Sequence, residues 1–344
     1  MGTKLADFDY LLPPELIAQE PLPERDASRL LVLHRDTGAI EHRAFPDLLE
    51  YLRPGDSLLL NDTAVMRARL VGTRAGTGGR MEALLLRELE PGRWEALVRP
   101  ARKARVGCEI ELSPGGPRLR VEGVLPEGRC VARLLASGAE APEAVLERWG
   151  RVPLPPYIKK PLADPDRYQT VYARERGSAA GPTAGFHFTP GLLGRVEQMG
   201  VRVAFVTLHI GLATFRPIRA EDVEDHVMHE EFYRVGPEAA EAVNAARRQG
   251  GRVVAVGTTT VRALESAAGP EGVSPREGWT RLFIYPGWRF RVVDALLTNF
   301  HLPRSSLLLL VAALAGREPV LRAYREAVER RYRFYSFGDA MLIL

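Results

Sequence analysis

The chain has 344 residues, 46% of them hydrophobic and 8% aromatic, which suits two or three ordinary globular domains. Its net charge of +4 is compatible with a polyanionic partner but does not identify one. No apolar run reaches the roughly 18 residues that a membrane helix needs, the N-terminal residues lack a signal-peptide pattern, and two cysteines argue against a disulfide framework. We therefore expect a cytoplasmic protein.

The pattern of apolar and turn-forming residues changes near residue 70. Residues 1–70 predict mixed α/β structure, with a buried strand at 58–60 that ends in a polar turn at 61–63. From about 70 to 150, short apolar runs are separated by Gly and Pro, a pattern typical of a small β-barrel or sandwich. These runs are 81–86, 94–98, 109–112, 119–124 and 130–135.

After a proline-rich linker at 153–157, predicted helices and strands alternate. Helices are expected at 190–199, 237–249, 305–315 and 317–331, and strands at 201–208, 252–256, 282–285 and 340–344. This pattern predicts an α/β fold with a mostly parallel sheet flanked by helices, in which ligands bind beyond the carboxyl ends of strands. We assign 1–70 and 151–344 to one discontinuous α/β catalytic domain, and 71–150 to an inserted β-barrel domain.

Five of the seven histidines lie between residues 187 and 301, most of them in loops beside predicted elements. Loops carry function because a scaffold can aim their side chains without unfolding. Any one of these histidines could be an ordinary turn or core residue, but the group as a whole favours a functional site in this stretch.

The segment Gly257-Thr258-Thr259-Thr260 follows a predicted strand and opens a predicted helix. Its hydroxyls and backbone N–H groups could hold an anionic ligand at the helix N-terminus. An ordinary threonine helix cap is the alternative. Neither a Walker lysine nor a G-x-G-x-x-G spacing is present, which disfavours a P-loop or dinucleotide site.

Two further patterns leave alternatives open. His226 and His229 have the spacing of half a metal site, but no second ligand pair stands at a usual distance, so we expect no metal. A role as a general base or in positioning a ligand, or a plain polar helix face, remains for them. Aromatic and cationic side chains interleave at 157–160 and 167–169, which suits RNA phosphates with base stacking, or a solvated linker.

A series of segments spans nearly the whole chain in a distinctive order. They are 8–10, 16–21, 25–30, 54–56, 60–63, 153–160, 167–172, 182–188, 208–211, 255–262, 297–303 and 332–341. Together they resemble the S-adenosylmethionine:tRNA ribosyltransferase-isomerase family of queuosine biosynthesis. The chain departs from the usual family residues at Ala64, Arg67, Ala213 and Glu230.

The resemblance implies an unusual reaction without a metal or prosthetic group. S-adenosylmethionine acts as a ribosyl donor, and the acceptor is 7-aminomethyl-7-deazaguanine at the wobble position of tRNA. The ribosyl group rearranges to give epoxyqueuosine, and adenine and methionine leave. The resemblance also implies an α/β domain with an inserted β-barrel.

This chemistry indicates which residue types to expect in the site. A carbon-bound proton beside the sulfonium must be removed, and adenine leaves more easily when protonated, so a base and an acid are needed. Histidine, with an ordinary pKa near 6.5, serves either role. The candidates are His187, His209 and His301, followed by His229 and Glu231. The sequence leaves open which is the base and which the acid.

Substrate-binding residues are expected around the same loops. Aromatic rings suit the sulfonium through cation–π attraction, and Thr258, Thr259 and Arg262 would orient ribose or carboxylate. The full set is Asn61, Asp62, Thr63, Tyr157, Lys159, Lys160, Thr183, Phe186, Phe188, Gly211, Thr258, Thr259, Arg262, Asn299 and Phe300, with Tyr285 as a further aromatic candidate.

The alternative functions are an ordinary methyltransferase, for which no glycine-rich loop is visible, and a non-catalytic RNA-binding protein. Oligomeric state is left open.

Overall fold

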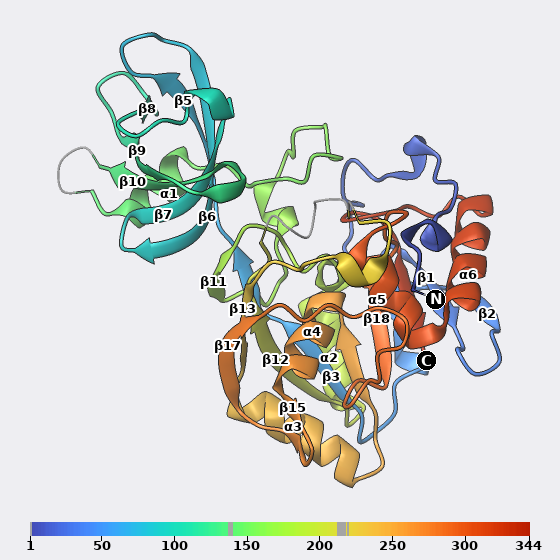
Figure 1. The fold of residues 1–344 in the computed structure, drawn as a ribbon. Helices are drawn as coiled ribbons and strands as arrows, with labels where there is room; N and C mark the ends of the chain where they lie inside the picture. Colours follow the sequence, from blue (N-terminus) through green and yellow to red (C-terminus); the bar gives the residue numbers. More distant parts are fainter. Residues whose placement is uncertain (1, 137–139, 212–217, 219) are drawn as a thin grey trace. The chain divides into compact units, whose positions relative to one another are not determined.

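The computed structural model describes residues 2–136, 140–211, 218 and 220–344. They form two compact units (Figure 1). The first comprises 1–63, 156–175 and 181–344, and the second comprises 64–155 and 176–180. The second unit thus begins before and ends after the predicted insertion at 71–150, and just outside those bounds Arg69, in the first barrel strand, pairs with Arg151.

The first unit is built on a nine-stranded sheet of mixed direction. In spatial order its strands are β17 (Arg276–Thr280), β13 (Glu231–Val235), β12 (Arg202–Leu208), β3 (Ser57–Asn61), β14 (Val253–Val256), β18 (Ala295–Asn299), β19 (Ala340–Ile343), β1 (Arg29–Leu33) and β2 (Ile40–Ala44). The central strands β12, β3, β14 and β18 run parallel to one another.

Helices cover both faces of these central strands, which explains why β3, β14, β18 and β19 are buried along their whole length. Leu58 and Leu60 pack on one face with α2 (Pro190–Gln198) and the 3₁₀ segment η3 (Phe45–Glu50). The alternate residues point the other way. The Ser57 hydroxyl donates to a carbonyl of α3 (Pro237–Arg248), and Asn61 reaches α4 (Thr258–Ala267).

The remaining helices of this unit are α5 (Ser306–Ala315) and α6 (Arg317–Glu329), which contact each other. None of the described helices has the length and apolar composition needed to cross a membrane. Short 3₁₀ segments complete the unit: η1 (Leu5–Phe8), η2 (Pro14–Leu16), η6 (Pro165–Tyr168), η7 (Thr183–His187) and η9 (Val223–Asp225). The short strands β15 (Ala268–Gly269) and β16 (Gly272–Val273) pair with each other.

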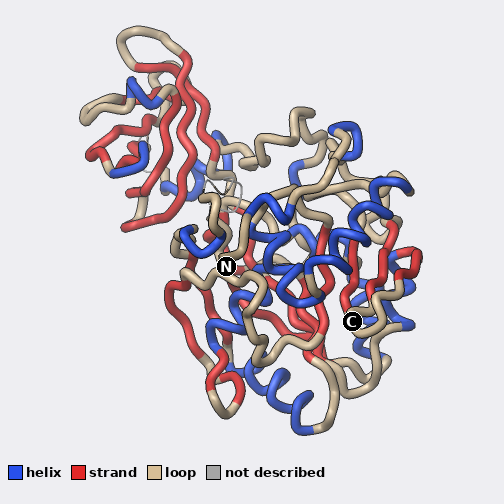
Figure 2. The backbone as a smooth tube through the Cα atoms, turned by 45° about the vertical axis from the view of Figure 1, so that its right-hand side comes forward, coloured by secondary structure: helices blue, strands red, loops and turns tan. Residues whose placement is uncertain are grey.

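The second unit contains a closed antiparallel barrel (Figure 2). Its strands are β5 (Arg69–Arg74), β6 (Arg80–Glu90), β7 (Arg93–Arg99), β8 (Glu109–Glu111), β9 (Arg118–Val124) and β10 (Arg129–Leu135). Alternate side chains point inward, as Trp94, Ala96 and Val98 do on β7. The 3₁₀ segments η4 (Ala101–Lys103) and η5 (Pro126–Gly128) lie between strands, and α1 (Pro142–Trp149) follows the barrel. The short strands β4 (Thr63–Val65) and β11 (Glu175–Ser178) lie where the chain passes between the units.

The α/β class with an inserted barrel is confirmed. Parallel pairing is restricted to part of the sheet: β13, β17 and β2 join antiparallel at the edges, and β19 runs antiparallel to β18. Short connections such as the β1–β2 hairpin need no crossover helix, so they add antiparallel strands to a parallel centre.

The strand expected at 282–285 is wrong. This apolar segment is irregular, and the strands lie on either side of it, as β17 and β18. Its backbone is satisfied by side chains instead: the Leu282 N–H donates to Thr280 Oγ1, and the Leu282 carbonyl accepts from Arg262. The apolar residues of this segment correctly predicted that Ile284 is buried. They did not indicate that the segment pairs with no other strand.

Candidate functional site

The candidate site lies where the four parallel strands end. The carboxyl end of β3 leads into residues 61–63, that of β12 into His209, that of β14 into Gly257, and β18 ends at Asn299. Because adjacent parallel strands end at the same edge of a sheet, these groups share one edge, where ligands bind in α/β folds. The antiparallel strand β13 begins at this edge too, since Tyr233 lies opposite Leu208.

Asn61 links the ends of these elements. Its side-chain amide donates to the Leu208 carbonyl (3.0 Å) and to Thr259 Oγ1 (3.1 Å). Its carbonyl oxygen accepts from the N–H groups of Leu208 (3.0 Å) and Thr63 (3.1 Å). All four hydrogen-bonding positions of this fully buried amide are thus used within the protein. Asn61 therefore positions β12, the 61–63 turn and helix α4 relative to one another.

Asp62 fixes the same turn from the other side. Its carboxylate accepts from Thr207 Oγ1 (2.8 Å) and from Arg174 Nε (2.7 Å). Asp62 is buried, whereas the Arg174 side chain is 58% exposed. The sequence nominated Asp62 but neither of its partners. The polar residue Thr207 near the end of an otherwise apolar strand was the available signal.

His209 is held by the hydroxyl of Thr63. Its Nδ1 lies 2.7 Å from Thr63 Oγ1, and its ring stacks on Phe232 with 5.5 Å between centroids. Thr63 Oγ1 donates to the Glu175 carbonyl over a long 3.5 Å, which leaves a lone pair to accept from an Nδ1–H. This network assigns the proton to Nδ1 and leaves Nε2 as an acceptor with no partner among the described residues. Burial lowers the pKa of His209, which favours the neutral ring.

Glu231 and Arg262 form a buried ion pair beside this edge. Glu231 Oε2 accepts from Arg262 Nη1, and Glu231 Oε1 accepts from the Gly211 N–H (2.8 Å). Arg262 Nε donates to the Leu282 carbonyl (3.0 Å). Its Nη2 is buried and has no hydrogen-bond partner among the described residues. A buried N–H group left without an acceptor is costly, so this guanidinium could accommodate one more anionic or carbonyl oxygen.

Helix α4 begins directly at the candidate site. Gly257 has φ +86°, a left-handed conformation that favours glycine, and it turns the chain from β14 into the helix. Thr258 and Thr259 are buried in the first turn, and neither caps the helix with its side chain. Thr260 donates to the Val256 carbonyl (2.6 Å). The predicted strand–turn–helix context is confirmed.

His187 occupies a fully bonded interior position. Asn299 Nδ2 lies 3.2 Å from its Nε2, and Ser28 Oγ lies 2.8 Å from its Nδ1. Asn299 Oδ1 in turn accepts from Thr183 Oγ1 (2.9 Å). Since an amide nitrogen can only donate, His187 Nε2 accepts and Nδ1 carries the proton. Burial, and to a smaller extent nearby Arg333, lowers the pKa of His187 to about 4. The imidazole is therefore neutral, and both of its ring nitrogens are hydrogen-bonded within the protein.

His301 is buried in a similar way. Its Nε2 lies 2.9 Å from Thr298 Oγ1, its backbone N–H donates to the Tyr324 hydroxyl (3.1 Å), and its carbonyl accepts from the Tyr10 hydroxyl. Burial lowers the pKa of His301 to about 3. The backbone of this residue thus joins the N-terminal segment to α6.

The nominated aromatic residues mostly pack in the interior. Phe188 contacts Phe45 edge-on at 5.2 Å, and Phe300 is surrounded by Tyr324 and two other rings. Both are fully buried. The remaining candidates are Phe186, which is 6% exposed and contacts Tyr168 and Phe337, and Tyr285, which is half-buried beside Phe283.

The strip at 157–160 is held by the termini of the first unit. The Tyr157 hydroxyl lies 2.6 Å from Ser336 Oγ, and the Lys159 N–H donates to Gln19. Lys160 is exposed and pairs with Glu20 at 3.5 Å. The guanidinium of Arg167 donates to the carbonyls of residues 22 and 23. Of the strip's cations, only Lys159 has a side chain with no ion pair or hydrogen bond among the described residues.

His226 and His229 do not share a helical face, because residues 226–230 form neither helix nor strand. The ring of His226 lies edge-on to that of Phe283, with 5.1 Å between the ring centroids. Burial lowers the pKa of His226, and the nearby His229 lowers it by a smaller amount. His229 is half-buried two residues before Glu231. Among the described residues, no group of three His, Cys, Asp or Glu side chains is arranged to hold a metal. Ala213 lies outside the described residues.

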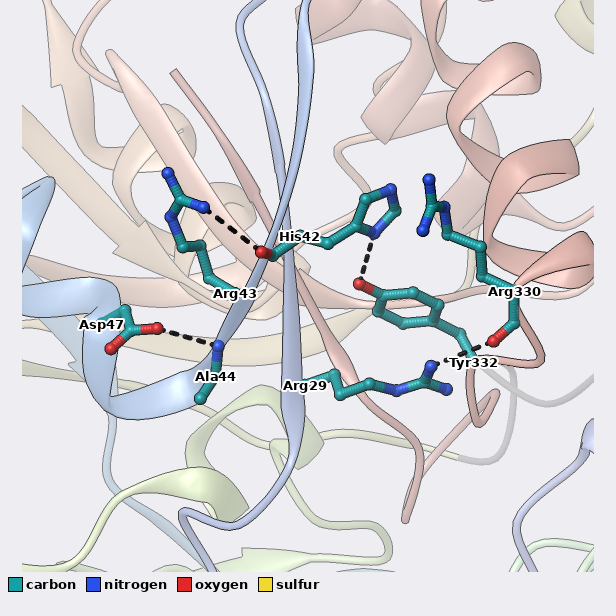
Figure 3. A pocket seen from close by; sticks show the side chains of 7 residues that line it. All are labelled: Arg29, His42, Arg43, Ala44, Asp47, Arg330 and Tyr332. Carbon is teal, nitrogen blue, oxygen red and sulfur yellow. Dashed lines mark hydrogen bonds between the residues drawn. The ribbon is translucent and has the colours of Figure 1, made fainter.

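A separate pocket of about 690 Å³ lies where β1 begins and β2 ends (Figure 3). Three arginines and a histidine line it, but each of these side chains already has a partner. Arg29 bonds to Asp339, Arg43 to Glu41, and both His42 and Arg330 to Glu326. His42 also contacts the Tyr332 hydroxyl at 2.7 Å. The pocket therefore has little uncompensated charge for a ligand.

Comparisons with known proteins agree on one family. Residues 5–343 match the model of the family described as "Queuosine biosynthesis protein". A relative from Symbiobacterium thermophilum is 60% identical over 99% of this chain and 100% of its own, and one from Pelotomaculum thermopropionicum is 59% identical over 99% of both. Both are named S-adenosylmethionine:tRNA ribosyltransferase-isomerase. A solved S-adenosylmethionine tRNA ribosyltransferase from Thermotoga maritima is 43% identical, with a TM-score of 0.57 over 98% of this chain and 100% of that one.

The buried His187 predicts a pH-dependent stability. Its folded-state pKa is about 4 against an ordinary 6.5, so between these pH values the unfolded state binds more protons. The stability that His187 contributes should therefore be fully present above about pH 6.5, and roughly 3 kcal/mol of it should be lost as pH drops toward 4. Urea unfolding across this range measures it. His187→Gln should show a shallower slope than the wild type. Equal slopes in a folded His187→Gln variant and the wild type would contradict the assignment.

Breaking the buried ion pair should be costly. Glu231→Gln leaves the Arg262 guanidinium buried without its counter-charge, so the free energy of unfolding should fall by about 3–5 kcal/mol. The matched control is Glu241→Gln, which breaks an exposed pair with Arg248 (59% and 62% exposed) and should cost less than about 1 kcal/mol. Denaturant titration compares the two, and a similar small loss in both variants would refute the structural importance of the buried pair.

Proposed function

Since the chain belongs to the S-adenosylmethionine:tRNA ribosyltransferase-isomerase family of queuosine biosynthesis, we propose that its reaction takes place at the carboxyl edge of strands β12, β3, β14 and β18. The enzyme transfers and isomerises the ribosyl moiety of S-adenosylmethionine onto tRNA. The acceptor is 7-aminomethyl-7-deazaguanine at the wobble position, the product is epoxyqueuosine-tRNA, and adenine and methionine leave.

One observation carries this placement. Thr63 and His209, from two adjacent parallel strand ends, form a hydrogen-bonded pair whose outer ring nitrogen is unoccupied among the described residues. Asn61 fixes both partners, because it bonds to the Thr63 N–H and to the backbone of Leu208. A base held in one tautomer by a fixed hydroxyl suits proton abstraction from carbon.

His209 is the general base in this proposal. Burial lowers its pKa, so the ring is neutral near neutral pH, and the Thr63 bond directs the lone pair to Nε2. That nitrogen removes the proton from the carbon beside the sulfonium. His229, half-buried two residues before Glu231, is the candidate for protonating the leaving adenine.

Arg262 is the candidate anchor for the carboxylate of the methionine portion. Its Nη1 and Nε are fixed by Glu231 and the Leu282 carbonyl, while Nη2 lacks a partner among the described residues. A carboxylate oxygen would satisfy this buried N–H through a charge-assisted bond. Thr258 and Thr259, one turn earlier on α4, supply hydroxyls and N–H groups for the donor's ribose.

His187 and His301 are positioning residues rather than proton carriers in this proposal. Both are neutral because burial lowers their pKa values to about 4 and about 3. His187 orients Asn299, whose other atom accepts from Thr183. Phe188 and Phe300 support the same layer from the interior. Gly211 fixes Glu231 through its N–H, and Asp62 fixes the 61–63 turn.

The reaction products distinguish the alternatives. The full-length protein is incubated with S-adenosylmethionine and tRNA carrying the 7-aminomethyl-7-deazaguanine base, and small products are separated by chromatography. Adenine and methionine in equal amounts are expected. S-adenosylhomocysteine would instead indicate a methyltransferase, and tRNA binding without turnover would indicate a non-catalytic RNA-binding protein.

Replacing the proposed base should remove turnover without unfolding the protein. His209→Gln should lower kcat by about 10²–10⁴-fold, the usual contribution of a positioned base. Because the pKa of His209 is lowered, the wild-type rate should fall on the acid side only as pH drops below about 6.5. Thr63→Val, which keeps the ring but removes its partner, should change this acid limb. The control His34→Gln should keep full activity. Wild-type kcat in a folded His209→Gln variant would refute the assignment.

A further inference from the structure

The outside of the barrel carries many arginines that are neutralised by neighbouring glutamates. Many of those on the strands form ion pairs: Arg69 with Glu82, Arg93 and Arg133 with Glu122, Arg118 and Arg120 with Glu109, and Arg129 with Glu95. Cross-strand pairs of opposite charge are the expected way to place arginine on a barrel surface. Pairing of arginine with glutamate is therefore the usual arrangement on the strands of this barrel.

One end of the barrel lacks such pairs. Six cations lie in or beside the β5–β6 and β7–β8 connections, and none of their side chains has an ion pair or hydrogen bond among the described residues. They are Arg74, Arg80, Arg99, Arg102, Lys103 and Arg105. Residues 74–80 and 99–107 contain no acid, and the third loop at this end, 125–128, contributes the single acid Glu127. We call the six cations the barrel-end cluster.

The two connections lie together in space. In an antiparallel barrel β5 and β7 run in the same direction, because each pairs antiparallel with β6, so both end at the same side. Gly79 and Lys103 are close, since a Cβ atom added at Gly79 would lie 3.2 Å from Lys103 Nζ. Arg80, Arg99, Arg102 and Arg105 reach the surface. The cluster is therefore a solvated patch of one sign.

The composition of the patch indicates what it binds. Uncompensated like charges repel one another, and a partner that brings regularly spaced negative charges removes this repulsion. The two connections contain no Phe, Tyr, Trp or His, so they have no ring on which a base could stack. Three of the five residues 75–79 in the β5–β6 connection are glycine instead, which leaves room for a sugar–phosphate backbone. Such a surface binds phosphates without distinguishing the base sequence.

We propose that the barrel-end cluster is a docking surface for the phosphate backbone of the tRNA substrate. This inference rests on the proposed function for the identity of the RNA. The cluster supplies affinity and orientation, while the acceptor base is handled at the carboxyl edge of the sheet in the first unit. It adds a substrate-binding role for the inserted barrel, separate from the 157–160 strip.

The test uses the full chain with three neighbouring cations replaced, Arg102→Gln, Lys103→Gln and Arg105→Gln. The matched control makes the same charge change at three ion-paired arginines, Arg118→Gln, Arg120→Gln and Arg129→Gln. Fluorescence anisotropy measures Kd for tRNA between roughly 50 and 200 mM salt, a range in which counterion release changes affinity strongly. Circular dichroism establishes that both variants are folded.

The cluster variant should bind tRNA about 10–100-fold more weakly at the low-salt end, and its salt slope should be shallower by roughly 2–3, about 0.9 for each phosphate that is no longer neutralised. The control should change either quantity far less. In turnover assays the cluster variant should show a raised KM for tRNA, with the KM for S-adenosylmethionine and kcat unchanged. Equal Kd values and salt slopes in a folded cluster variant and wild type, or equal reductions in affinity in both variants, would overturn the proposal.

Binding and turnover separate this inference from the proposed function. tRNA that lacks the 7-aminomethyl-7-deazaguanine base should bind the cluster as well as the complete substrate does, because the cluster contacts phosphates. If wild type released no adenine but bound tRNA with the predicted salt slope, the proposed reaction would fail and the docking surface would stand. If turnover occurred with no effect of the three substitutions on tRNA binding, the docking surface alone would fail.

Discussion

The fully satisfied amide of Asn61 is the constraint on which the candidate site depends. It bonds at once to the backbone of β12, to the turn at Thr63 and to the first turn of α4 through Thr259. Each of these elements ends or begins at the candidate site, where the orientation of a polar group matters. Because the Asn61 amide is buried, water cannot replace a partner that is lost. The orientation of His209 follows, because Thr63 can hold the ring only if the turn is fixed.

Burial divides the histidines that the sequence grouped together. His187 and His301 lie inside the fold, where burial keeps the imidazoles neutral; both ring nitrogens of His187 and Nε2 of His301 bond to neighbouring side chains. His209 is only partly buried and keeps one nitrogen without a described partner. Desolvation thus accounts for a structural role in two positions, and it is consistent with the proton-transfer role that we propose for His209. The Glu231–Arg262 pair follows the same logic, since the carboxylate fixes a guanidinium that retains one unsatisfied N–H.

Sequence patterns predicted the parts of this arrangement that depend on local chemistry. The β3 strand, the turn after it, the Gly257 turn into α4 and the barrel strands all follow from apolar runs and their breaks. The antiparallel strand β13 and the contribution of Ser28 to the site could not be predicted in this way, because both depend on pairing with residues distant in sequence. The strand predicted at 282–285 was wrong for the same reason. The side chains of this segment are apolar, but its backbone bonds to the side chains of Thr280 and Arg262 and not to another strand. Phe188 and Phe300 also show that a motif position does not determine whether a ring faces a ligand or the core.

We propose that the donor binds at the carboxyl edge of the parallel strands, between His209 and Arg262. A crystal structure of the full chain with a stable S-adenosylmethionine analogue tests this placement most directly. We expect the analogue's carboxylate on Arg262 Nη2 and its carbon beside the sulfur position within about 3–3.5 Å of His209 Nε2, the separation expected for reacting atoms. An analogue bound instead in the pocket beside Arg29 and Tyr332, or with its carboxylate away from Arg262, would contradict it.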